Sequence, residues 1–347
     1  MNRPLPTPYA DLADRAFWKN AVNARSLFDI ADLWTPKFSI GPKMPVATYG
    51  SCFAQHLGRA LRARDYNWLN AEPGAGQSPQ TNRAFHYGVF SARTGRIDTT
   101  TLLLQWVRWA VGDITPPDAF WNAAGRFHDP FRPSIEPQGF ASMDEAKRSR
   151  QTTIDAFATS IRKARVFVLT LGQTERWRHL QQGYEYPLCP GHAGGQFDPD
   201  THGFDNLGFA ETLESLWDAI KIMRRMNPKL RLVLSVSPVP LSATMSGQHV
   251  IPATTYSKSV LRAVCGELVQ QLPHVDYFPA YEILSSPAFR ASFFEPNQRD
   301  ITRTGVEFVM EHFFDGHAGA QTPTAQPDKS AHIICKDALL ANERGMH

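Results

Sequence analysis

Long hydrophobic runs are absent from this sequence, and cysteine is scarce. No segment approaches the roughly 20 apolar residues that a membrane-spanning helix needs, and prolines among residues 1–8 interrupt the apolar stretch that a secretory signal requires. The cysteines are widely spaced and form no CxxC pair: Cys52, Cys189, Cys265 and Cys335. These absences argue against a disulfide framework, a zinc finger and a membrane anchor. We therefore expect a cytoplasmic protein without a membrane span.

A strong charge of either sign is also missing. The 347 residues carry a formal net charge of +3, and the densest basic cluster, residues 147–151, is typical of a solvated helix face. The composition therefore indicates no nucleic-acid partner. With 42% hydrophobic and 20% charged residues, the chain has the balance of an ordinary globular protein. Its length suits one enlarged α/β domain with insertions.

The chain divides into three predicted parts. Residues 1–40 are rich in aromatics and prolines without a lasting period, which predicts an arm that packs on the domain. Residues 41–315 form the predicted α/β domain, and the polar residues 316–347 form a predicted tail. Glycine, proline and polar residues mark loop insertions within the domain. These insertions are predicted at about residues 71–83, 116–137 and 183–206.

Short runs rich in β-branched and aromatic residues alternate with segments of helical periodicity. Strands are predicted at residues 44–49, 165–171, 230–236 and 274–278. Helices are predicted at residues 53–61, 100–111, 143–163, 209–223, 260–269 and 306–313, with a polar loop at 237–255. This alternation favours a parallel sheet that helices cover on both faces. Functional groups then gather at the carboxyl ends of the strands.

Gly50, Ser51 and Cys52 form the turn between the first predicted strand and the first predicted helix. A nucleophile there would be exposed at the edge of the sheet, where the helix amides and dipole favour a thiolate or an oxyanion. A structural interpretation is also open, in which Ser51 caps the helix and Cys52 is a small buried apolar residue. Spacing alone does not decide between the two.

Residues 49–56 read Tyr-Gly-Ser-Cys-Phe-Ala-Gln-His. This motif resembles the signature of the GSCFA family, a group similar to the SGNH (GDSL-like) hydrolases. Further matching segments are residues 169–177, 235–240, 256–259 and 277–282, so that the resemblance covers most of residues 40–315. It implies an α/β fold, a three-layer α/β/α sandwich with a mainly parallel, flavodoxin-like sheet.

The resemblance also implies roles for the turn residues. SGNH enzymes have Gly-Asp-Ser in their first motif with the serine as nucleophile, which places Cys52 at the nucleophile and Ser51 at the aspartate. A thiol is the better nucleophile near neutral pH, so Cys52 is favoured, although a one-residue shift of the turn would exchange the two roles. Gly88 is the candidate for the glycine of the second motif, whose amide serves the oxyanion hole.

The third SGNH motif, Gly-x-Asn-Asp, overlays residues 172–175. Thr174 then stands for the oxyanion-hole asparagine and Glu175 for the aspartate, with Gln173 beside them as a further oxyanion or substrate-binding candidate. A threonine hydroxyl can still donate a hydrogen bond to an oxyanion. The same residues also fit a plain helix-start turn that Thr174 caps.

The fifth SGNH motif, Asp-x-x-His followed five residues later by glycine, is where this chain departs from the resemblance. Gly305 leads back to Asp300 at the histidine position and to Asn297 at the aspartate position. An aspartate cannot replace histidine near neutral pH without a large shift of its pKa. The expected catalytic histidine is therefore missing, and Asn297 and Asp300 stay as candidates for substrate binding.

Two other histidines are candidates for the missing base. His249 lies in the loop after the third predicted strand, at the functional edge of the sheet, and is the preferred candidate. His56, one helical turn beyond the thiol, is the weaker one. Glu175 or Glu282 would orient the imidazole. In the structural alternative His249 is only an exposed loop residue.

Lys258 lies between two serines at a predicted helix start, where it is a candidate for binding a carboxylate or phosphate. The alternative is that Ser257 caps the helix and the lysine is solvated. Cys189, His192 and His202 have the side chains of metal ligands, but their spacing matches no standard site. We therefore expect no metal and no required cofactor.

Together these residues predict an SGNH-like acyl enzyme, either an esterase or an O-acyltransferase, with acyl-CoA as the candidate donor if it is a transferase. The resemblance implies polysaccharide biosynthesis as the context, and hence a small-molecule or glycan substrate. The alternative is a non-catalytic glycan-binding or polysaccharide-assembly protein that keeps the fold without the fifth motif. The sequence indicates no oligomeric state.

Overall fold

The centre of the molecule is a parallel sheet. A computed structural model describes residues 7–317 except residues 75 and 77, so Cys335 and the predicted tail beyond residue 317 lie outside the described residues. The strands are parallel throughout, in the order β1-β4-β8-β9. Their bounds are β1 (Val46–Gly50), β4 (Val166–Leu171), β8 (Arg231–Val236) and β9 (Val275–Tyr277). All of these strands coincide closely with predicted ones, because strands buried on both faces appear in the sequence as short apolar runs.

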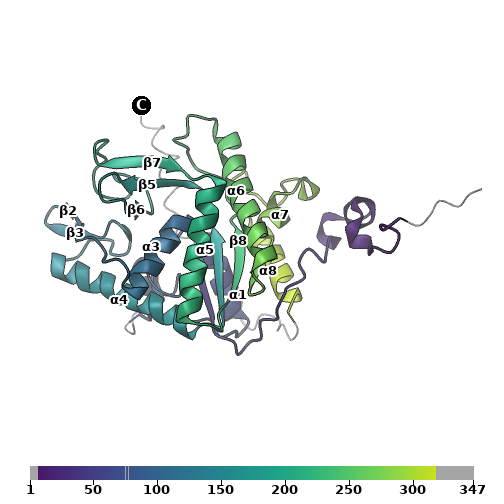
Figure 1. The fold of residues 1–347 in the computed structure, drawn as a ribbon, viewed down its shortest axis with the longest axis horizontal. Coiled ribbons are helices and arrows are strands. Elements are labelled where there is room, and N and C mark those ends of the chain that lie inside the picture. The colour runs from purple at the N-terminus through teal and green to yellow at the C-terminus, as the bar shows by residue number, and fades with distance from the viewer. Residues whose placement is uncertain (1–6, 75, 77, 318–347) are drawn as a thin grey trace, which may run out of the picture.

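Helices cover both faces of this sheet, as Figure 1 shows. Side chains that alternate along the strands enter two separate cores: Ala47 and Tyr49 face one, while Val46 and Val166 face the other. The first core contains residues of α3 (Thr100–Val111), α4 (Met143–Lys163), α5 (Phe209–Met226) and α6 (Val250–Gln271). The second contains residues of α1 (Ala54–Ala63), α7 (Ala280–Ser285) and α8 (Arg303–Asp315). The fold is therefore the expected three-layer α/β/α sandwich.

Two predicted loop insertions contain strands of their own. An antiparallel hairpin, β2 (Trp121–Ala123) and β3 (Arg126–His128), lies within residues 116–137. A second antiparallel sheet has the order β6-β5-β7, with bounds β5 (Glu175–His179), β6 (Glu185–Tyr186) and β7 (His202–Asn206). These strands were not predicted because they are short and mostly polar, so that strand pairing rather than local composition stabilises them. A short helix, α2 (Pro79–Ala84), precedes the turn at Gly88.

Helix α6 begins ten residues earlier than the apolar spacing predicted. His249 is its N-cap, and its Nδ1 accepts a hydrogen bond of 3.2 Å from the amide of Ile251. Pro252 lies in the first turn, where a helix amide needs no intrahelical partner, so the proline is tolerated there. Ser257 is consequently in the middle of the helix and is not its cap.

The predicted N-terminal arm contacts the domain through its second half. Phe28 packs against Phe293, and Trp34 stacks on Phe313 of α8. The amide of Lys37 donates a hydrogen bond of 2.7 Å to Asp276 in β9. Single-turn helices occupy the arm and one loop of the domain: η1 (Asp14–Ala16), η2 (Lys19–Asn23), η3 (Leu27–Asp29) and η4 (Pro287–Phe289).

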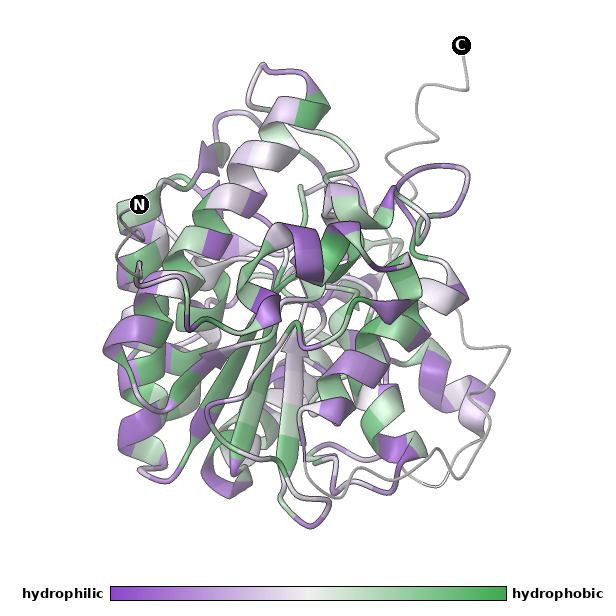
Figure 2. Cartoon of the chain, turned by 90° about the vertical axis from the view of Figure 1, so that its right-hand side faces the viewer, coloured by the Kyte–Doolittle hydropathy of each residue, from purple (hydrophilic) through white to green (hydrophobic). Residues whose placement is uncertain are grey.

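Apolar residues concentrate in the strands, and polar residues lie on the outer parts of the helices and loops, as Figure 2 shows. Within the part of the chain that the structure describes, no helix combines the length and the apolar character that crossing a bilayer requires.

Candidate functional site

The strands β1, β4 and β8 end at one edge of the sheet, and the turn after β1 is shaped by Gly50. This residue has φ +127°, a conformation that side chains rarely adopt, and its α-carbon faces the backbone of Thr170 on β4. The amide of Ser51 then donates a hydrogen bond of 2.8 Å to the carbonyl of Thr170. Because only glycine permits this approach, the first residue of the motif is required by the backbone.

Gly50→Ala is expected to destabilise the fold strongly. The added methyl group would collide with the Thr170 carbonyl in a backbone conformation that already disfavours it. Strain and overpacking together predict a loss of at least about 2 kcal/mol in the free energy of unfolding. Urea unfolding measures it, with Gly112→Ala as a control for positive φ without a close neighbour. Equal losses in the two variants would contradict the role of close approach at Gly50.

Ser51 and Cys52 are both buried at this edge. Cys52 is 5% exposed, and helix α1 begins two residues later, at Ala54. No side chain caps this helix, and the Ser51 hydroxyl is buried without a hydrogen-bond partner. The structural interpretation in which Ser51 caps the helix is therefore wrong.

A small polar pocket of about 280 Å³ surrounds the two residues. Its walls come from the segments that follow β1, β4 and β8, from the loop before α3 and from the loop before α8. The lining residues are Ser51, Cys52, Arg96, Asp98, Gly172, Gln173, Ser237, Val239, Pro240, Leu241 and Arg299. This is the edge at which a parallel sheet places ligands.

Asp98 is fixed between the ends of β1 and β4. Its carbonyl accepts hydrogen bonds from the amides of Gly172 (2.8 Å) and Gln173 (3.3 Å), and the preceding amide of Ile97 donates to Gly50 (3.1 Å). A side chain at Gly172 would collide with the Asp98 carboxylate, so the glycine of this motif allows the close approach. The same carboxylate forms an ion pair of 2.9 Å with Arg96.

Lys258 reaches the site from α6. It is 1% exposed, and its Nζ donates a hydrogen bond of 2.6 Å to the carbonyl of Gly172, a pocket residue. Burial lowers the pKa of Lys258 to about 7, although Asp98 and Cys52 favour its charged form. Burial therefore produces a lysine that releases its proton near neutral pH, next to the candidate nucleophile.

The structure brings together four of the residues predicted from the sequence. Ser51, Cys52 and Gln173 line the pocket, and Lys258 lies directly behind Gly172. The sequence analysis treated Lys258 as a ligand for an external anion, whereas the structure buries it against a carbonyl.

The two candidate histidines lie elsewhere. His249 is exposed at the N-terminus of α6, where its Nδ1 is occupied by the amide of Ile251. His56 lies on α1 and packs against Phe53, the residue before the helix, and burial lowers the pKa of the His56 imidazole to about 3. No histidine is among the described residues that line the pocket of Cys52.

Thr174 and Glu175 lead into β5 rather than into a helix, so the helix-start alternative for this turn is wrong. The Thr174 hydroxyl donates a hydrogen bond of 2.7 Å to Asn206. The backbone amide of Thr174 donates one of 2.9 Å to the hydroxyl of Ser257. Glu175 accepts hydrogen bonds from the hydroxyl of Thr244 and from the amide of Met245, and burial raises the pKa of the Glu175 carboxyl. Both side chains thus hold neighbouring segments in place.

Four further candidates also lie outside the pocket lining. Glu282 pairs with Arg262 and accepts a hydrogen bond of 2.8 Å from Tyr277. Gly88 occupies a turn with φ +69°. Asn297 and Asp300 are exposed and bond each other at 2.8 Å.

The sequence analysis missed the charged residues of the pocket. Arg299, which lies between Asn297 and Asp300, lines the pocket and donates a hydrogen bond of 2.7 Å to Ser242. Arg96 and Asp98 precede a helix in a segment without a recognisable motif. The only sequence signal for Arg299 was its place between Asn297 and Asp300, which the sequence offered as candidates for substrate binding.

No group of three or more histidine, cysteine, aspartate or glutamate side chains with a metal-binding arrangement occurs among residues 7–317 as described. His202 of the candidate ligand loop instead accepts a hydrogen bond of 3.0 Å from the amide of Asp198.

The sandwich and its polar pocket define the class of protein: an α/β protein with a candidate active site at the carboxyl ends of parallel strands. The model of the GSCFA family matches residues 45–313, which is well over half of the chain, and the chain belongs to the GSCFA family. Neither the curated proteins nor the solved structures gave a match.

Proposed function

We propose that this protein is an acyl enzyme, an esterase or an O-acyltransferase, with Cys52 as its nucleophile and Lys258 as its base. One arrangement carries the proposal: Cys52 and Asp98 line one pocket, and the buried Lys258 donates a hydrogen bond to the carbonyl of Gly172, which belongs to the same lining. A lysine whose pKa is near 7 is half deprotonated at neutral pH, as a general base must be. Lys258 thus takes the role of general base, for which the sequence offered only His249 and His56, and neither of these histidines lines the pocket.

In the proposed reaction, Lys258 takes the proton of the Cys52 thiol, and the thiolate attacks the carbonyl carbon of an ester. The bond to the ester oxygen then breaks, and the leaving alcohol takes the proton from Lys258. The acyl group remains on sulfur as a thioester. Water or an acceptor hydroxyl attacks this thioester, passes its proton to Lys258, and releases Cys52, which regains the proton.

Several features support this chemistry electrostatically. The start of α1 two residues after Cys52 brings the positive end of a helix dipole to the sulfur, which favours the thiolate. Arg96 and Arg299 line the pocket and favour negative charge that develops on the substrate. Asp98 offsets these cations, so that Lys258 stays able to accept a proton.

Water as acceptor makes the protein an esterase, and a sugar hydroxyl makes it an O-acyltransferase, for which acyl-CoA is the candidate donor. We propose a carbohydrate of polysaccharide biosynthesis as the substrate, on the basis of the family resemblance. Ser51, whose buried hydroxyl lacks a hydrogen-bond partner, is the alternative nucleophile.

Labelling tests the nucleophile. Iodoacetamide at pH 7.5 is expected to alkylate Cys52 rapidly, and peptide mapping locates the label. Cys265 is the internal control, because burial raises the pKa of its thiol to about 12 and should leave it unmodified. Cys52→Ala is expected to lower the hydrolysis of p-nitrophenyl acetate by about 10³-fold or more, and Ser51→Ala by less than about tenfold.

A fluorophosphonate label on Ser51, together with full activity of Cys52→Ala, would transfer the nucleophilic role to Ser51. If the folded wild-type protein takes neither label and turns over no ester, the acyl enzyme is excluded. That result favours the non-catalytic glycan-binding or polysaccharide-assembly protein.

A further inference from the structure

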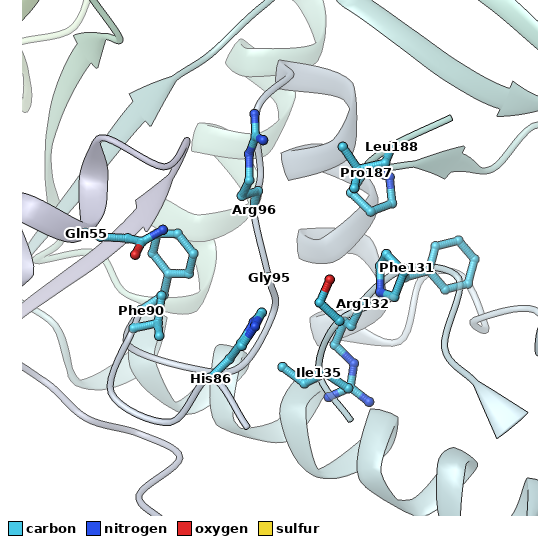
Figure 3. A pocket seen from close by; sticks show the side chains of 13 residues that line it. Gln55, His86, Phe90, Gly95, Arg96, Phe131, Arg132, Ile135, Pro187 and Leu188 are labelled. Carbon is cyan, nitrogen blue, oxygen red and sulfur yellow. The ribbon is translucent and has the colours of Figure 1, made fainter. Parts of the chain in front are cut away.

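A second, larger pocket adjoins the site of Cys52 and is mainly apolar. It encloses about 520 Å³, part of which is open to solvent. Figure 3 shows Gln55 and Phe90 on one side of it and Phe131, Pro187 and Leu188 on the other. Gln55 of α1 and three longer segments form its walls: residues 86–96, residues 131–135, and the residues that follow β6. We call it the side pocket.

The side pocket and the Cys52 pocket share a wall. Arg96 lines both of them. Gln55, three residues after Cys52 on the same turn into α1, lines the side pocket and is 2% exposed. The apolar space of the side pocket thus adjoins the pocket that holds Cys52, with the side chain of Arg96 in the lining of both.

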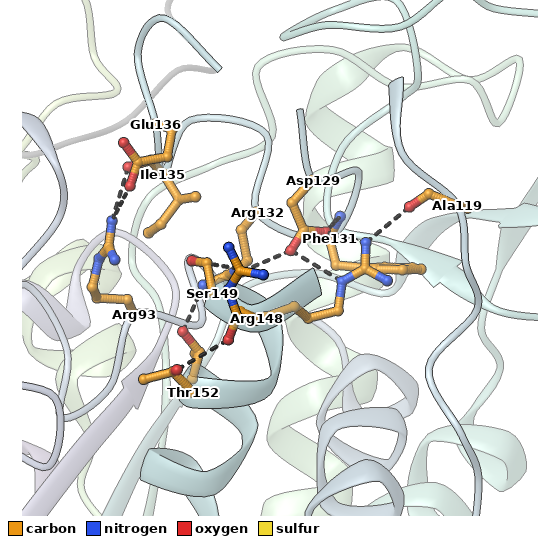
Figure 4. Close-up of polar contacts among 12 residues, drawn as sticks. Arg93, Ala119, Asp129, Phe131, Arg132, Ile135, Glu136, Arg148, Ser149 and Thr152 are labelled. Carbon is orange, nitrogen blue, oxygen red and sulfur yellow. Dashed lines mark hydrogen bonds and ion pairs between the residues drawn. The ribbon is translucent and has the colours of Figure 1, made fainter. Parts of the chain in front are cut away.

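Buried ion pairs hold the far wall in place, as Figure 4 shows. Asp129 pairs with Arg132 and Arg150, each at 2.9 Å. Arg93 donates hydrogen bonds to the carbonyl of Ile135 (3.1 Å) and to Glu136 (2.9 Å). These buried ion pairs and hydrogen bonds fix the position of the wall, and preorganised walls lower the entropy cost of binding.

The chemistry of these walls suits a hydrocarbon better than a sugar. A sugar ring carries hydroxyls that lose hydrogen bonds on burial unless the wall replaces them. Val89, Phe90, Ile135 and Leu188 offer no such partners. Arg132 is fully buried, and its guanidinium is already occupied by Asp129, Thr153 and Ser149.

We propose that the side pocket binds the acyl chain of the substrate, so that the protein prefers acyl groups of six to eight carbons over acetyl. The inference rests on the proposed function and specifies its substrate class. Its mainly apolar walls suit a hydrocarbon chain, which an acetyl group lacks. The acyl carbonyl lies at Cys52, the chain lies in the side pocket, and the alcohol leaves through the polar pocket.

A series of p-nitrophenyl esters tests this preference, from acetate to octanoate below their micelle concentrations. Burial of each methylene is expected to raise kcat/KM by about threefold to fourfold. Hexanoate should therefore exceed acetate by on the order of 100-fold. Equal values of kcat/KM for the two esters in the wild-type protein would overturn the proposal.

Leu188→Trp fills the side pocket and is expected to lower kcat/KM for octanoate at least about 30-fold, while acetate changes less than about twofold. Leu180→Trp is the matched control, because Leu180 is 40% exposed and lies outside the side-pocket lining. It should leave both esters unchanged. If Leu188→Trp does not fold, Val89→Phe is used in its place, because it narrows the side pocket at another lining residue. Parallel losses on both esters would overturn the proposal.

Binding distinguishes failure of this inference from failure of the proposed function. Sodium octanoate is titrated calorimetrically into the wild-type protein, Cys52→Ala and Leu188→Trp. Binding that survives in Cys52→Ala and disappears in Leu188→Trp supports the side pocket even if no ester is hydrolysed. Turnover of acetate without binding of octanoate overturns the side pocket and leaves the acyl enzyme standing.

Discussion

Lys258→Met is expected to remove esterase activity by about 10³-fold while the protein stays folded. In the proposed mechanism the neutral amine is the base, so kcat/KM of the wild-type protein should rise with pH through about pH 7, near the lowered pKa of Lys258. The variant should lose this inflection, because methionine accepts no proton. Rates on p-nitrophenyl hexanoate from pH 5.5 to 9 measure the effect.

Lys229→Met is the matched control, since Lys229 is exposed and lies between α5 and β8. It should keep the activity and the pH profile of the wild-type protein. A folded Lys258→Met variant that stays within threefold of wild-type activity would remove the lysine from the mechanism.

The same substitution carries a stability signature with a defined sign. An unfolded lysine has a pKa of about 10.4, so from pH 7 to pH 10 the unfolded chain holds a proton that buried Lys258 has released. The contribution of Lys258 to stability therefore rises with pH across this window. Lys258→Met should be more stable than the wild-type protein at pH 7, with a difference that narrows toward pH 9. If Lys258 instead stabilised the fold in its charged form, Lys258→Met would be less stable than the wild-type protein at pH 7. Urea unfolding at pH 7 and at pH 9 distinguishes the two cases.

Asp129→Ala is expected to be among the most destabilising substitutions in the chain. Asp129 is 1% exposed and is the shared partner of Arg132 and Arg150, which are buried as well. Its removal leaves two buried guanidinium groups without this counter-charge, which predicts a loss of about 3–5 kcal/mol in the free energy of unfolding. Asp118→Ala breaks an exposed pair with Lys147 and should cost about 1 kcal/mol or less.

Acid should weaken the same cluster. Burial alone would raise the pKa of Asp129, but Arg150 and Arg132 outweigh burial and hold this pKa below its usual range. The stability that Asp129 contributes is therefore complete above about pH 4 and is lost as pH falls through its lowered pKa. Similar unfolding midpoints for Asp129→Ala and Asp118→Ala would show that this cluster does not stabilise the walls of the side pocket.

The central sheet was accessible to sequence analysis because its signals are local. The apolar run at residues 165–171 predicted β4 almost residue for residue, and the spacing at residues 143–163 matched α4. The antiparallel strands β5 and β7 depend on pairing between segments about 30 residues apart. No local pattern reports such pairing, so β7 fell within the predicted loop at residues 183–206 and β5 was not predicted as a strand.

The sequence by itself determined the strand-turn-helix unit at Gly50 and the two candidate nucleophiles after it, because each depends on neighbouring residues. Only the tertiary structure decided what accompanies the thiol. Asp98 and Arg299 come from segments that are distant in the chain, and Lys258 acquires its lowered pKa only through burial. Burial and charge proximity arise from packing among distant segments, and that packing places Lys258 against the carbonyl of Gly172, behind the pocket of Cys52.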